Sequence, residues 1–585
     1  MRTPDLARGS RTTHLWLLMA IPFLALAGAT AKIHADGTKG ASAGEMADLV
    51  VLHAKVYTEN SSQPQAQALA VAGDKILAVG SEAAIERYRG PATKVIDAAG
   101  RAVLPGFTDC HIHLLESALQ MDEPDLSGAR NAAEIEKILR VYGAGHPGSG
   151  WVLGIGWTYD AFPGGMPDKK MLDEIFPDRP VYIDSYDGHS AWVNSKALEA
   201  AGITRTTPDP ANGNIVRDPK TGEATGALKE TATGVVQKVL PKATKEEKWD
   251  AARKAMALAN ANGLVRVHSA GGDFDSLAMY EEMKRKGELT LRIYAAKIID
   301  PPHLTPDDLK DIEIARTRYH DDWVEAGAAK FFMDGVVESH TAAMLAPYTD
   351  DPSASGTPNW KATPYNQAVL MLNQHGIQVF THAIGDRAVR MALDAYARSA
   401  QTTGHADVRD RVEHIETISP QDVPRFAKIG VIASMQPLHA NPDADTSVWA
   451  ANVGLERVKL AFAWKTLEIA GARLAFGSDW NVVTLNPWAG VQCAVTRQTP
   501  DGQPAGGWIP AERISVTDAI AAYTIGAAYA GHREKTEGSL EPGKLADFII
   551  VDRDPFAVDP HQIGGTQVIE TIVGGRVVFE AAARK

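Results

Sequence analysis

Apolar runs in the middle of the chain alternate with segments that favour helices. Most of the runs are followed by small or polar residues and then by a helix-prone segment. There are eight such runs, at residues 102–110, 264–268, 289–296, 328–333, 377–381, 411–413, 431–434 and 473–477. Eight β-then-α units predict an α/β fold of the (β/α)8 TIM-like barrel type, whose active site lies at the carboxyl ends of the strands.

The interval between the first two runs is far longer than a normal βα connection, so we expect a large insertion after the first strand, at about residues 115–250. We interpret this insertion as a lid over the site, because its aromatic residues can enclose an apolar or aromatic group. The alternative is that several of them form the insertion's own core. The residues concerned are Trp151, Trp157, Tyr159, Tyr182, Tyr186, His189 and Trp192.

Short strand patterns also occur at both ends of the chain. Alternating apolar residues begin at residues 47–52, and a second strand pattern covers 66–79, with Gly73-Asp74 as a turn signal. Similar patterns cover residues 546–551, 568–573 and 576–578. We therefore expect one small β-sandwich domain built from residues 47–103 and 535–585, with the barrel at 104–534.

The N-terminal segment has the residue pattern of a targeting signal. Arg2, Arg8 and Arg11 precede an apolar run from Leu15 to Ala27, and small residues follow it up to Ala31. A basic start, a short apolar stretch and a small-residue cleavage point predict a signal peptide at 1–31, followed by a linker at 32–46. We expect a secreted or periplasmic protein without stable membrane association after cleavage. The alternative is an uncleaved anchor, although the run is short for a bilayer span.

The composition of the chain limits the classes of molecule that we expect it to bind. The formal net charge is −13 and the sequence pI about 5.8, so no basic face for nucleic acid is expected. The expected partner is a small-molecule substrate, and a homodimer is compatible with the sequence. The two cysteines, Cys110 and Cys493, are expected to be free thiols, because a chain of this size does not need a disulfide.

Polar residues at the predicted strand ends carry the chemistry. Alternation along the first strand places His111 and His113 on the same face, where both can touch one metal. Other candidates follow at the fourth, fifth, sixth and eighth strands: Lys330, His382, His414 and Asp479. An isolated His or Asp at a strand end is more often structural, but this set spread over several strand ends predicts a divalent metal site. Imidazole and carboxylate are ligands that suit zinc and similar ions.

Several motifs resemble the amidohydrolase superfamily. The resemblance is closest to amidohydrolase family 3, the branch that includes N-substituted formamide deformylases, and it runs from about residue 47 to 579. The motifs are LPGFTDCHIH (104–113), WVNSKAL (192–198), TGALKE (225–230), HAIGDRA (382–388), MQP (435–437), GSDW (477–480) and EGSLEPGKLAD (537–547).

The resemblance implies roles for the candidate ligands. It implies that His111 and His113 bind one metal and that His382 and His414 are ligands of a second. Asp479 matches an aspartate that is both a ligand and a proton shuttle. Lys330 falls where many relatives carry a carboxylated lysine between two metals. The alternative is a barrel lysine paired with Asp334 or another acid, which leaves one metal per chain.

The expected reaction is hydrolysis of a C–N bond, either an amide or an N-acyl or N-formyl group. A metal-activated hydroxide attacks the carbonyl, and Asp479 passes the proton to the departing nitrogen. The same chemistry also serves an ester, a lactone or a ring deamination, and the sequence does not separate these. A different class of function is a non-catalytic periplasmic metal-binding protein. Candidate substrate-binding residues are His189, His340, Gln436, His439 and Trp157.

Overall fold

The computed structural model describes residues 46–404, 407–440 and 447–582. The expected signal peptide and most of the expected linker lie outside the described residues. Within the described ranges, none of the helices combines the length and the apolar character needed to cross a membrane.

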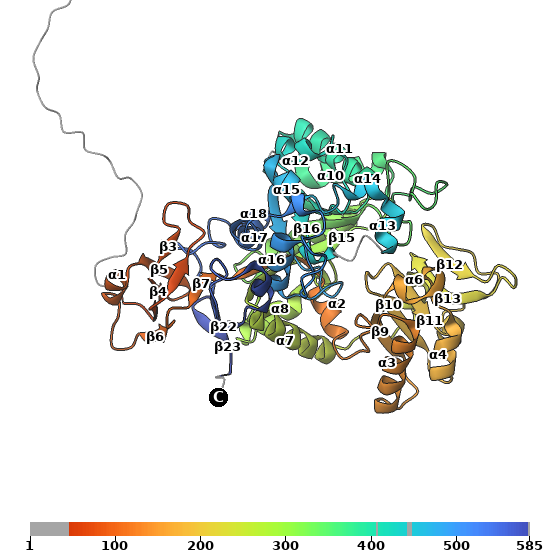
Figure 1. The fold of residues 1–585 in the computed structure, drawn as a ribbon, viewed down its shortest axis with the longest axis horizontal. Helices are drawn as coiled ribbons and strands as arrows, with labels where there is room; N and C mark the ends of the chain where they lie inside the picture. Colours follow the sequence, from red (N-terminus) through yellow and green to blue (C-terminus); the bar gives the residue numbers. More distant parts are fainter. Residues whose placement is uncertain (1–45, 405–406, 441–446, 583–585) are drawn as a thin grey trace, which may run out of the picture. The chain divides into compact units, whose positions relative to one another are not determined.

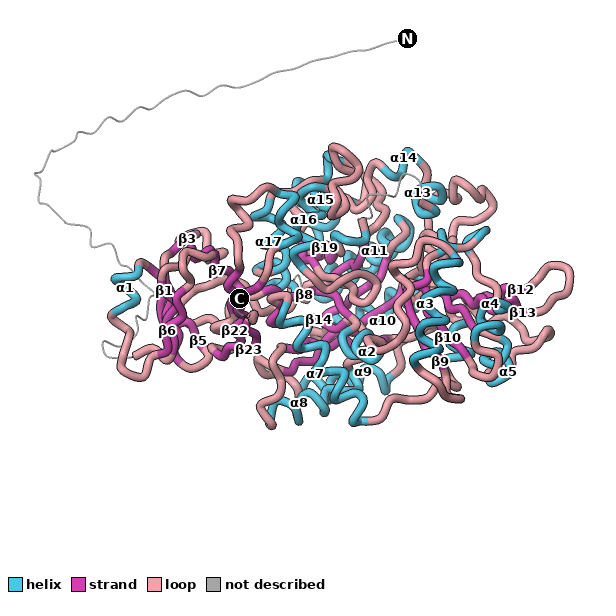
Figure 2. Tube along the Cα trace, turned by 60° about the horizontal axis from the view of Figure 1, so that its bottom comes forward, coloured by secondary structure: helices cyan, strands magenta, loops and turns pink. Residues whose placement is uncertain are grey.

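The centre of the fold is a parallel sheet of eight strands, as predicted. Its order is β20-β19-β18-β17-β16-β15-β14-β8, so barrel strands that follow one another in the chain are neighbours in the sheet. Figure 2 shows the strands in magenta, with β8, β14 and β19 labelled, and the helices in cyan. The strands are β8 (Phe107–Ile112), β14 (Leu264–Ser269), β15 (Arg292–Ile298), β16 (Val324–Phe332), β17 (Gln378–Ala383), β18 (Arg411–His414), β19 (Ile432–Met435) and β20 (Arg473–Phe476).

Backbone hydrogen bonds beyond the last strand bring the two edges of this sheet together. The amide of Asp479 donates to the carbonyl of His111 at 2.7 Å, and the amide of His113 donates to the carbonyl of Trp480 at 3.1 Å. The (β/α)8 barrel predicted from the apolar runs is confirmed.

Helices cover the outside of the barrel sheet (Figure 1). Helix α7 begins with a capping box, in which Thr244 and Glu247 satisfy each other's backbone amides. The surrounding helices are α7 (Lys245–Ala261), α8 (Leu277–Arg285), α9 (Pro306–Arg318), α10 (Ala362–Gln374), α11 (Asp386–Thr403), α12 (Val423–Ile429), α15 (Trp464–Ile469), α16 (Pro487–Thr496), α17 (Val516–Tyr523) and α18 (Ile525–Ala530). Short helices in the loops are α2 (Leu114–Leu119), α13 (Val448–Val453) and α14 (Leu455–Val458).

The first predicted strand, at 102–110, is two strands. Strand β7 (Ala102–Pro105) pairs with β21 (Phe548–Val551) in a sheet outside the barrel, and β8 begins at Phe107. Gly106 separates them, and a Cβ there would clash with the side chain of Val265. The continuous apolar run hid this boundary, because both strands are fully buried.

The insertion between β8 and β14 contains its own five-stranded sheet, ordered β12-β13-β11-β10-β9. One apolar cluster includes Trp157, Ile183 and Trp192, and a second includes Tyr182 and Val193. Alternate residues of β10 thus belong to different cores. The strands are β9 (Val152–Trp157), β10 (Val181–Ser185), β11 (Ser190–Val193), β12 (Gly213–Arg217) and β13 (Ala224–Glu230), with α3 (Ala132–Gly145), α4 (Lys169–Ile175), α5 (Ser195–Ala200) and α6 (Thr233–Gln237).

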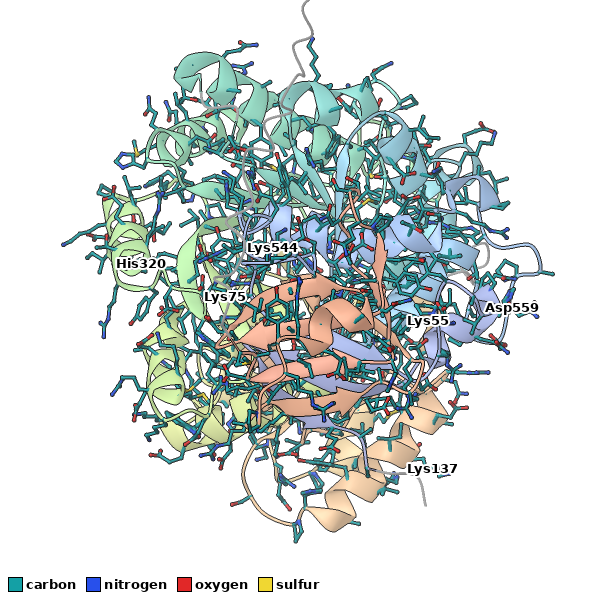
Figure 3. The ribbon with its side chains drawn as sticks, turned by 90° about the vertical axis from the view of Figure 1, so that its left-hand side faces the viewer. Lys55, Lys75, Lys137, His320, Lys544 and Asp559 are labelled. Atoms are coloured by element: carbon teal, nitrogen blue, oxygen red, sulfur yellow. The ribbon has the colours of Figure 1, made fainter. Side chains whose placement is uncertain are left out.

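Two further sheets lie outside the barrel; one is built from strands near the beginning of the described chain, and the other combines strands from both of its ends. Figure 3 shows the strands from the beginning of the chain in front of those from its end, with Lys55, Lys75 and Lys544 labelled. Their orders are β5-β4-β1-β6 and β23-β22-β21-β7-β2-β3. The elements are β1 (Leu49–Leu52), β2 (Lys55–Tyr57), β3 (Gln65–Ala66), β4 (Ala68–Ala72), β5 (Lys75–Gly80), α1 (Glu82–Glu86), β6 (Lys94–Asp97), β21 (Phe548–Val551), β22 (Val568–Val573) and β23 (Arg576–Glu580).

One apolar cluster joins these two sheets, with Val51 and Val71 from one and Phe548 and Ile572 from the other. The predicted β-sandwich is therefore present. Buried ion pairs tie the C-terminal segment to the barrel: Arg266 on β14 holds Glu537 with contacts of 2.6 and 2.7 Å, and Arg292 on β15 holds Asp547 with contacts of 2.7 and 2.9 Å.

Candidate metal centre

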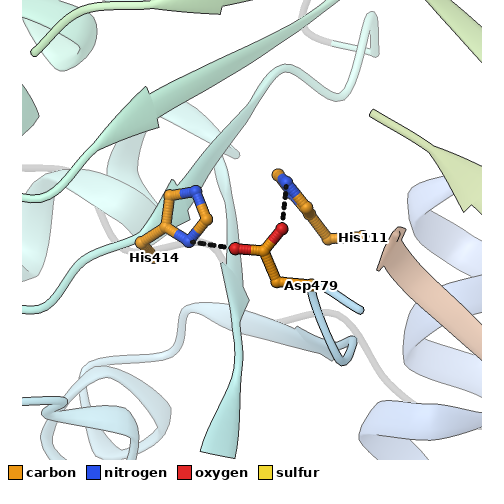
Figure 4. Close-up of side chains that lie close together, drawn as sticks. All are labelled: His111, His414 and Asp479. Atoms are coloured by element: carbon orange, nitrogen blue, oxygen red, sulfur yellow. Dashed lines mark ion pairs between the residues drawn. The ribbon is translucent and has the colours of Figure 1, made fainter. Parts of the chain in front are cut away.

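Three side chains from different parts of the barrel meet at the carboxyl ends of its strands. His111 comes from β8, His414 from β18, and Asp479 from the segment after β20. Each offers one ligand atom, and these atoms lie within 4.8 Å of one another. Figure 4 shows the carboxylate of Asp479 between the two imidazoles. Its Oδ1 lies 3.5 Å from His111 Nε2, and its Oδ2 lies 3.8 Å from His414 Nδ1.

The other predicted ligands surround this group. His113 Nε2 lies 3.3 Å from Asp479 Oδ1. The ring of His382 lies 4.5 Å from the ring of His414, measured between centroids. Lys330 Nζ lies 3.1 Å from His111 Nε2. The structure therefore brings all six predicted ligand positions together.

The backbone is strained at two of these residues. His414 has a φ of 74° and Asp479 a φ of 59°, in the left-handed region that non-glycine residues rarely adopt. Such conformations cost about 1–3 kcal/mol each and cluster at functional sites. At Asp479 the backbone amide is anchored by its bond to His111, so the strain places the carboxylate against that histidine.

The protonation states suit a cation. Burial and the nearby Lys330 lower the pKa of His111 to about 4. Burial and neighbouring cationic groups also hold the pKa values of His382 and His414 well below their ordinary range. Burial alone would raise the pKa of Asp479, but His111 and His113 hold it far below its usual value. Although burial opposes it, the contact with Asp479 raises the pKa of His113. Neutral imidazoles, as at His111, His382 and His414, and an ionised carboxylate are the ligand set that zinc and similar ions accept, so these residues fit a divalent metal.

Lys330 is fully buried on β16, and burial is the main reason that its pKa falls to about 8. The alternative pairing with Asp334 is not formed. The carboxylate of Asp334 instead accepts the backbone amides of Ala343, Ile384 and Gly385 at 2.8–3.1 Å. The hydrogen-bond partner of Lys330 is therefore His111, and the carboxylates of Glu413 and Asp479 lie close enough to oppose the fall in its pKa.

Sequence reasoning missed the residues that hold the ligands. Glu413 accepts a hydrogen bond from Nδ1 of His111 at 2.6 Å. Although burial opposes it, Arg411 and His111 lower the pKa of Glu413 to about 2. Asp109 accepts hydrogen bonds from the amide and hydroxyl of Ser478, next to Asp479. Both residues are charged and lie inside otherwise apolar strands. Because charged residues are rarely buried without a partner, this pattern could have indicated that each one contacts another polar residue.

The candidate substrate-binding residues separate into two groups. His189 lies at the site: its ring is 5.3 Å from the ring of His382, and its Nδ1 is 3.0 Å from Glu230 Oε2. His439 stacks on His414 with 5.8 Å between centroids, and its Nε2 lies 3.7 Å from Asp479. Gln436 is buried behind His414, and its Oε1 lies 2.9 Å from His414 Nδ1.

The other two candidates lie away from the ligands. Trp157 is fully buried in the insertion's core, and its indole N–H donates to the carbonyl of Ile183 at 3.1 Å. Its prediction as a substrate contact is therefore wrong in this structure, and the alternative of a core residue applies. His340 pairs with Asp350 at 2.8 Å and packs edge-on against Tyr348. The described contacts do not place it beside the metal ligands.

Comparisons with known proteins agree with this geometry. Residues 94–579 match the model of a family described as the amidohydrolase family. The chain is 34% identical to the protein LONG AFTER FAR-RED 3 of Arabidopsis thaliana, over 92% of each chain. It is 28% identical to N-substituted formamide deformylase of Arthrobacter pascens, over 92% of this chain and 99% of that protein.

The fold is also similar to a solved structure. An uncharacterized metal-dependent hydrolase from Pyrococcus horikoshii superposes with a TM-score of 0.68 and 27% identity, covering 88% of this chain and 99% of the other. The resemblance seen in the motifs is thus confirmed over nearly the whole described chain. The chain belongs to the amidohydrolase family and is a hydrolase that acts on carbon–nitrogen bonds.

Proposed function

We propose that the protein hydrolyses an amide, N-acyl or N-formyl bond of a small molecule at the barrel site, with zinc as the metal. The observation that carries this proposal is the convergence of His111, His414 and Asp479 within 4.8 Å. His113 and His382 complete the set from the same strand ends.

The residues have distinct tasks. His111, His113, His382, His414 and Asp479 would hold the metal, and Lys330, if carboxylated, would add two oxygen ligands. A bound divalent cation lowers the pKa of a water from about 15.7 to about 7 and polarises a carbonyl oxygen. Asp479 carries a carboxylate oxygen that can accept the proton of that water and donate it to the departing nitrogen. Its anchored backbone holds this oxygen in place through both transfers.

We further propose that Lys330 is carboxylated. Its buried Nζ has His111 Nε2 as its close polar partner, and its pKa of about 8 leaves part of the amine neutral near pH 7. A neutral amine adds carbon dioxide to form a carbamate and releases one proton. The carbamate offers two anionic oxygens where the amine offers none, so it suits a position between two cations.

His189 is the proposed substrate contact from the insertion. Glu230 holds its Nδ1, and Glu230 itself accepts a hydrogen bond from Thr341 at 2.6 Å. This chain of contacts fixes the ring next to His382, where Nε2 can hydrogen-bond to a substrate group.

The proposed bond type is tested with a panel of formamides, N-acyl amino acids, esters, lactones and nucleobases, assayed with zinc and after chelation. Turnover is expected for a formamide or another amide, to be lost on chelation and restored by zinc. A protein that turns over only esters, lactones or nucleobases contradicts the C–N proposal. Activity that chelation leaves unchanged contradicts the metal.

Replacing Asp479 with Asn removes the proton acceptor but keeps an oxygen near the ligands. We expect kcat/KM per bound metal to fall by about 10²–10⁴, the usual contribution of general acid–base catalysis. Metal content is measured in the same samples, so that a lost ligand is separated from a lost proton transfer. Asp173→Asn, a surface carboxylate that accepts from Ser195, is the matched control. Unchanged turnover per metal in Asp479→Asn would rule out the shuttle.

Metal content and intact mass test Lys330. Two metals per chain with a mass excess of one carbon dioxide are expected, and the excess should disappear in Lys330→Ala. The mass must be recorded under native conditions, because carbamates decompose in acid. One metal and an unmodified mass in fully active protein would contradict the bridged site and support a single ion.

Replacing His189 with Gln should raise KM by about tenfold while metal content stays at the parent value, because a single hydrogen bond to the substrate is lost. His375→Gln is the control, since His375 also pairs with a glutamate, Glu313 at 2.6 Å, but on the surface. A His189→Gln protein with the parent KM, or one that loses metal, would contradict the substrate role.

A further inference from the structure

A line of charged side chains crosses the barrel interior and ends at the metal centre. Arg411 Nε lies 2.6 Å from Glu413 Oε1. Glu413 Oε2 lies 2.6 Å from His111 Nδ1, and His111 Nε2 faces Lys330 Nζ at 3.1 Å. All four side chains are fully buried, so bulk solvent does not screen these contacts.

Arg411 is itself held in one position. One guanidinium nitrogen donates to the carbonyl of Cys110 at 2.7 Å, and another donates to the Cys110 sulfur at 2.9 Å. The guanidinium carbon lies 3.4 Å from the centre of the Phe380 ring. These contacts span β8, β17 and β18, so Arg411 is fixed by the barrel and in turn fixes the position of the Glu413 carboxylate.

This arrangement determines which nitrogen of His111 is available. An ionised carboxylate only accepts hydrogen bonds, so Glu413 requires the proton of His111 on Nδ1. A neutral imidazole with its proton on Nδ1 presents its lone pair at Nε2. Nε2 is also the atom that lies 3.5 Å from Asp479 Oδ1. The contact with His414 is different, because its Nδ1 faces the amide of Gln436, which can donate or accept.

We propose that Glu413, braced by Arg411, is the positioning residue that commits Nε2 of His111 to the metal. The proposal rests on the metal site proposed above and adds two buried residues that touch neither substrate nor metal. Carboxylates in this position are worth about 10- to 100-fold in metal affinity where they have been removed from other metalloproteins.

Glu413→Gln is the direct test, because the amide keeps the shape but has only one acceptor oxygen. The positive charge of Arg411, which forms an ion pair with Glu413 at 2.6 Å, favours the amide oxygen on its side. The amide NH₂ therefore turns toward His111 and forces the imidazole proton onto Nε2. We expect the affinity for Zn²⁺, measured by competition with a chelating dye, to fall by about 10- to 100-fold. The visible spectrum of the Co²⁺-loaded protein, which reports the ligand set, should change as well.

Glu537→Gln is the matched control. Glu537 is also a buried glutamate paired with a buried arginine, Arg266, but it contacts no proposed ligand. Thermal unfolding of the metal-free proteins should show that both variants lose stability. Only Glu413→Gln should lose metal affinity and change the Co²⁺ spectrum. Equal losses of affinity in the two variants would mean that buried charge affects the metal only through stability, which overturns the proposal.

The double variant Arg411→Met with Glu413→Gln separates two effects of the single substitution: the orientation of the amide at residue 413 and the loss of the carboxylate charge. Without Arg411 the amide oxygen is free to accept from His111, so the double variant should bind Zn²⁺ several-fold more tightly than Glu413→Gln alone. Affinity no better than that of the single variant contradicts the bracing role of Arg411. If Glu413→Gln does not fold, Glu413→Asp replaces it: the shorter acid cannot reach Nδ1, and parent affinity there overturns the proposal.

The same experiment distinguishes this inference from the proposed function. If the parent protein binds no Zn²⁺, the proposed metal site itself is contradicted. If the parent binds Zn²⁺ and the Glu413→Gln protein binds it with equal affinity, the metal site is supported and only the positioning role of Glu413 is contradicted.

Discussion

The closing of the barrel is the constraint on which the rest of the site depends. The edges β8 and β20 meet through backbone hydrogen bonds made by the proposed ligands themselves, between Asp479 and His111 and between His113 and Trp480. Asp109 reinforces this seam by accepting from Ser478. A carboxylate from one edge is thereby set against two imidazoles from the other. The left-handed backbone of Asp479 is maintained because the seam holds it on both sides.

Around this seam the barrel buries an unusual amount of charge. An isolated buried charge is costly, so each one must have a partner. Arg411 and Glu413 partner each other behind His111, while Asp334 is satisfied by three backbone amides. The ion-pair partners of Asp479 are imidazoles, and the polar partner of Lys330 is the imidazole of His111. A divalent cation beside Asp479 would give this carboxylate a further counter-charge, which supports the proposed metal site.

Much of this arrangement was predictable from the sequence, and the exceptions have physical causes. The barrel strands were visible because parallel strands covered on both faces are continuous apolar runs. The ligands were visible because they stand at the ends of those runs. The boundary at Gly106 was hidden, since β7 and β8 are both fully buried and leave no polar residue between them. Trp157 was predicted as a substrate contact because the sequence pattern of a strand does not distinguish an aromatic residue in a core from one that lines a binding site.

Glu413 shows a different limit. It stands beside His414 in the chain, yet its partner is His111 on β8, a strand that is not a neighbour of β18 in the sheet. No local pattern encodes such a pair. The family resemblance supplies expected ligands but not the carboxylate behind them, so only the folded chain reveals that Glu413 contacts Nδ1 of His111.

The most direct test of the central claim is the position of the metal in crystals of the zinc-loaded protein. Diffraction data recorded on either side of the zinc absorption edge locate the ion without assumptions about the ligands. The account predicts an anomalous peak about 2.0–2.2 Å from His111 Nε2 and from a carboxylate oxygen of Asp479. A peak that lies elsewhere, or a zinc ion bound through Nδ1 of His111, would contradict it.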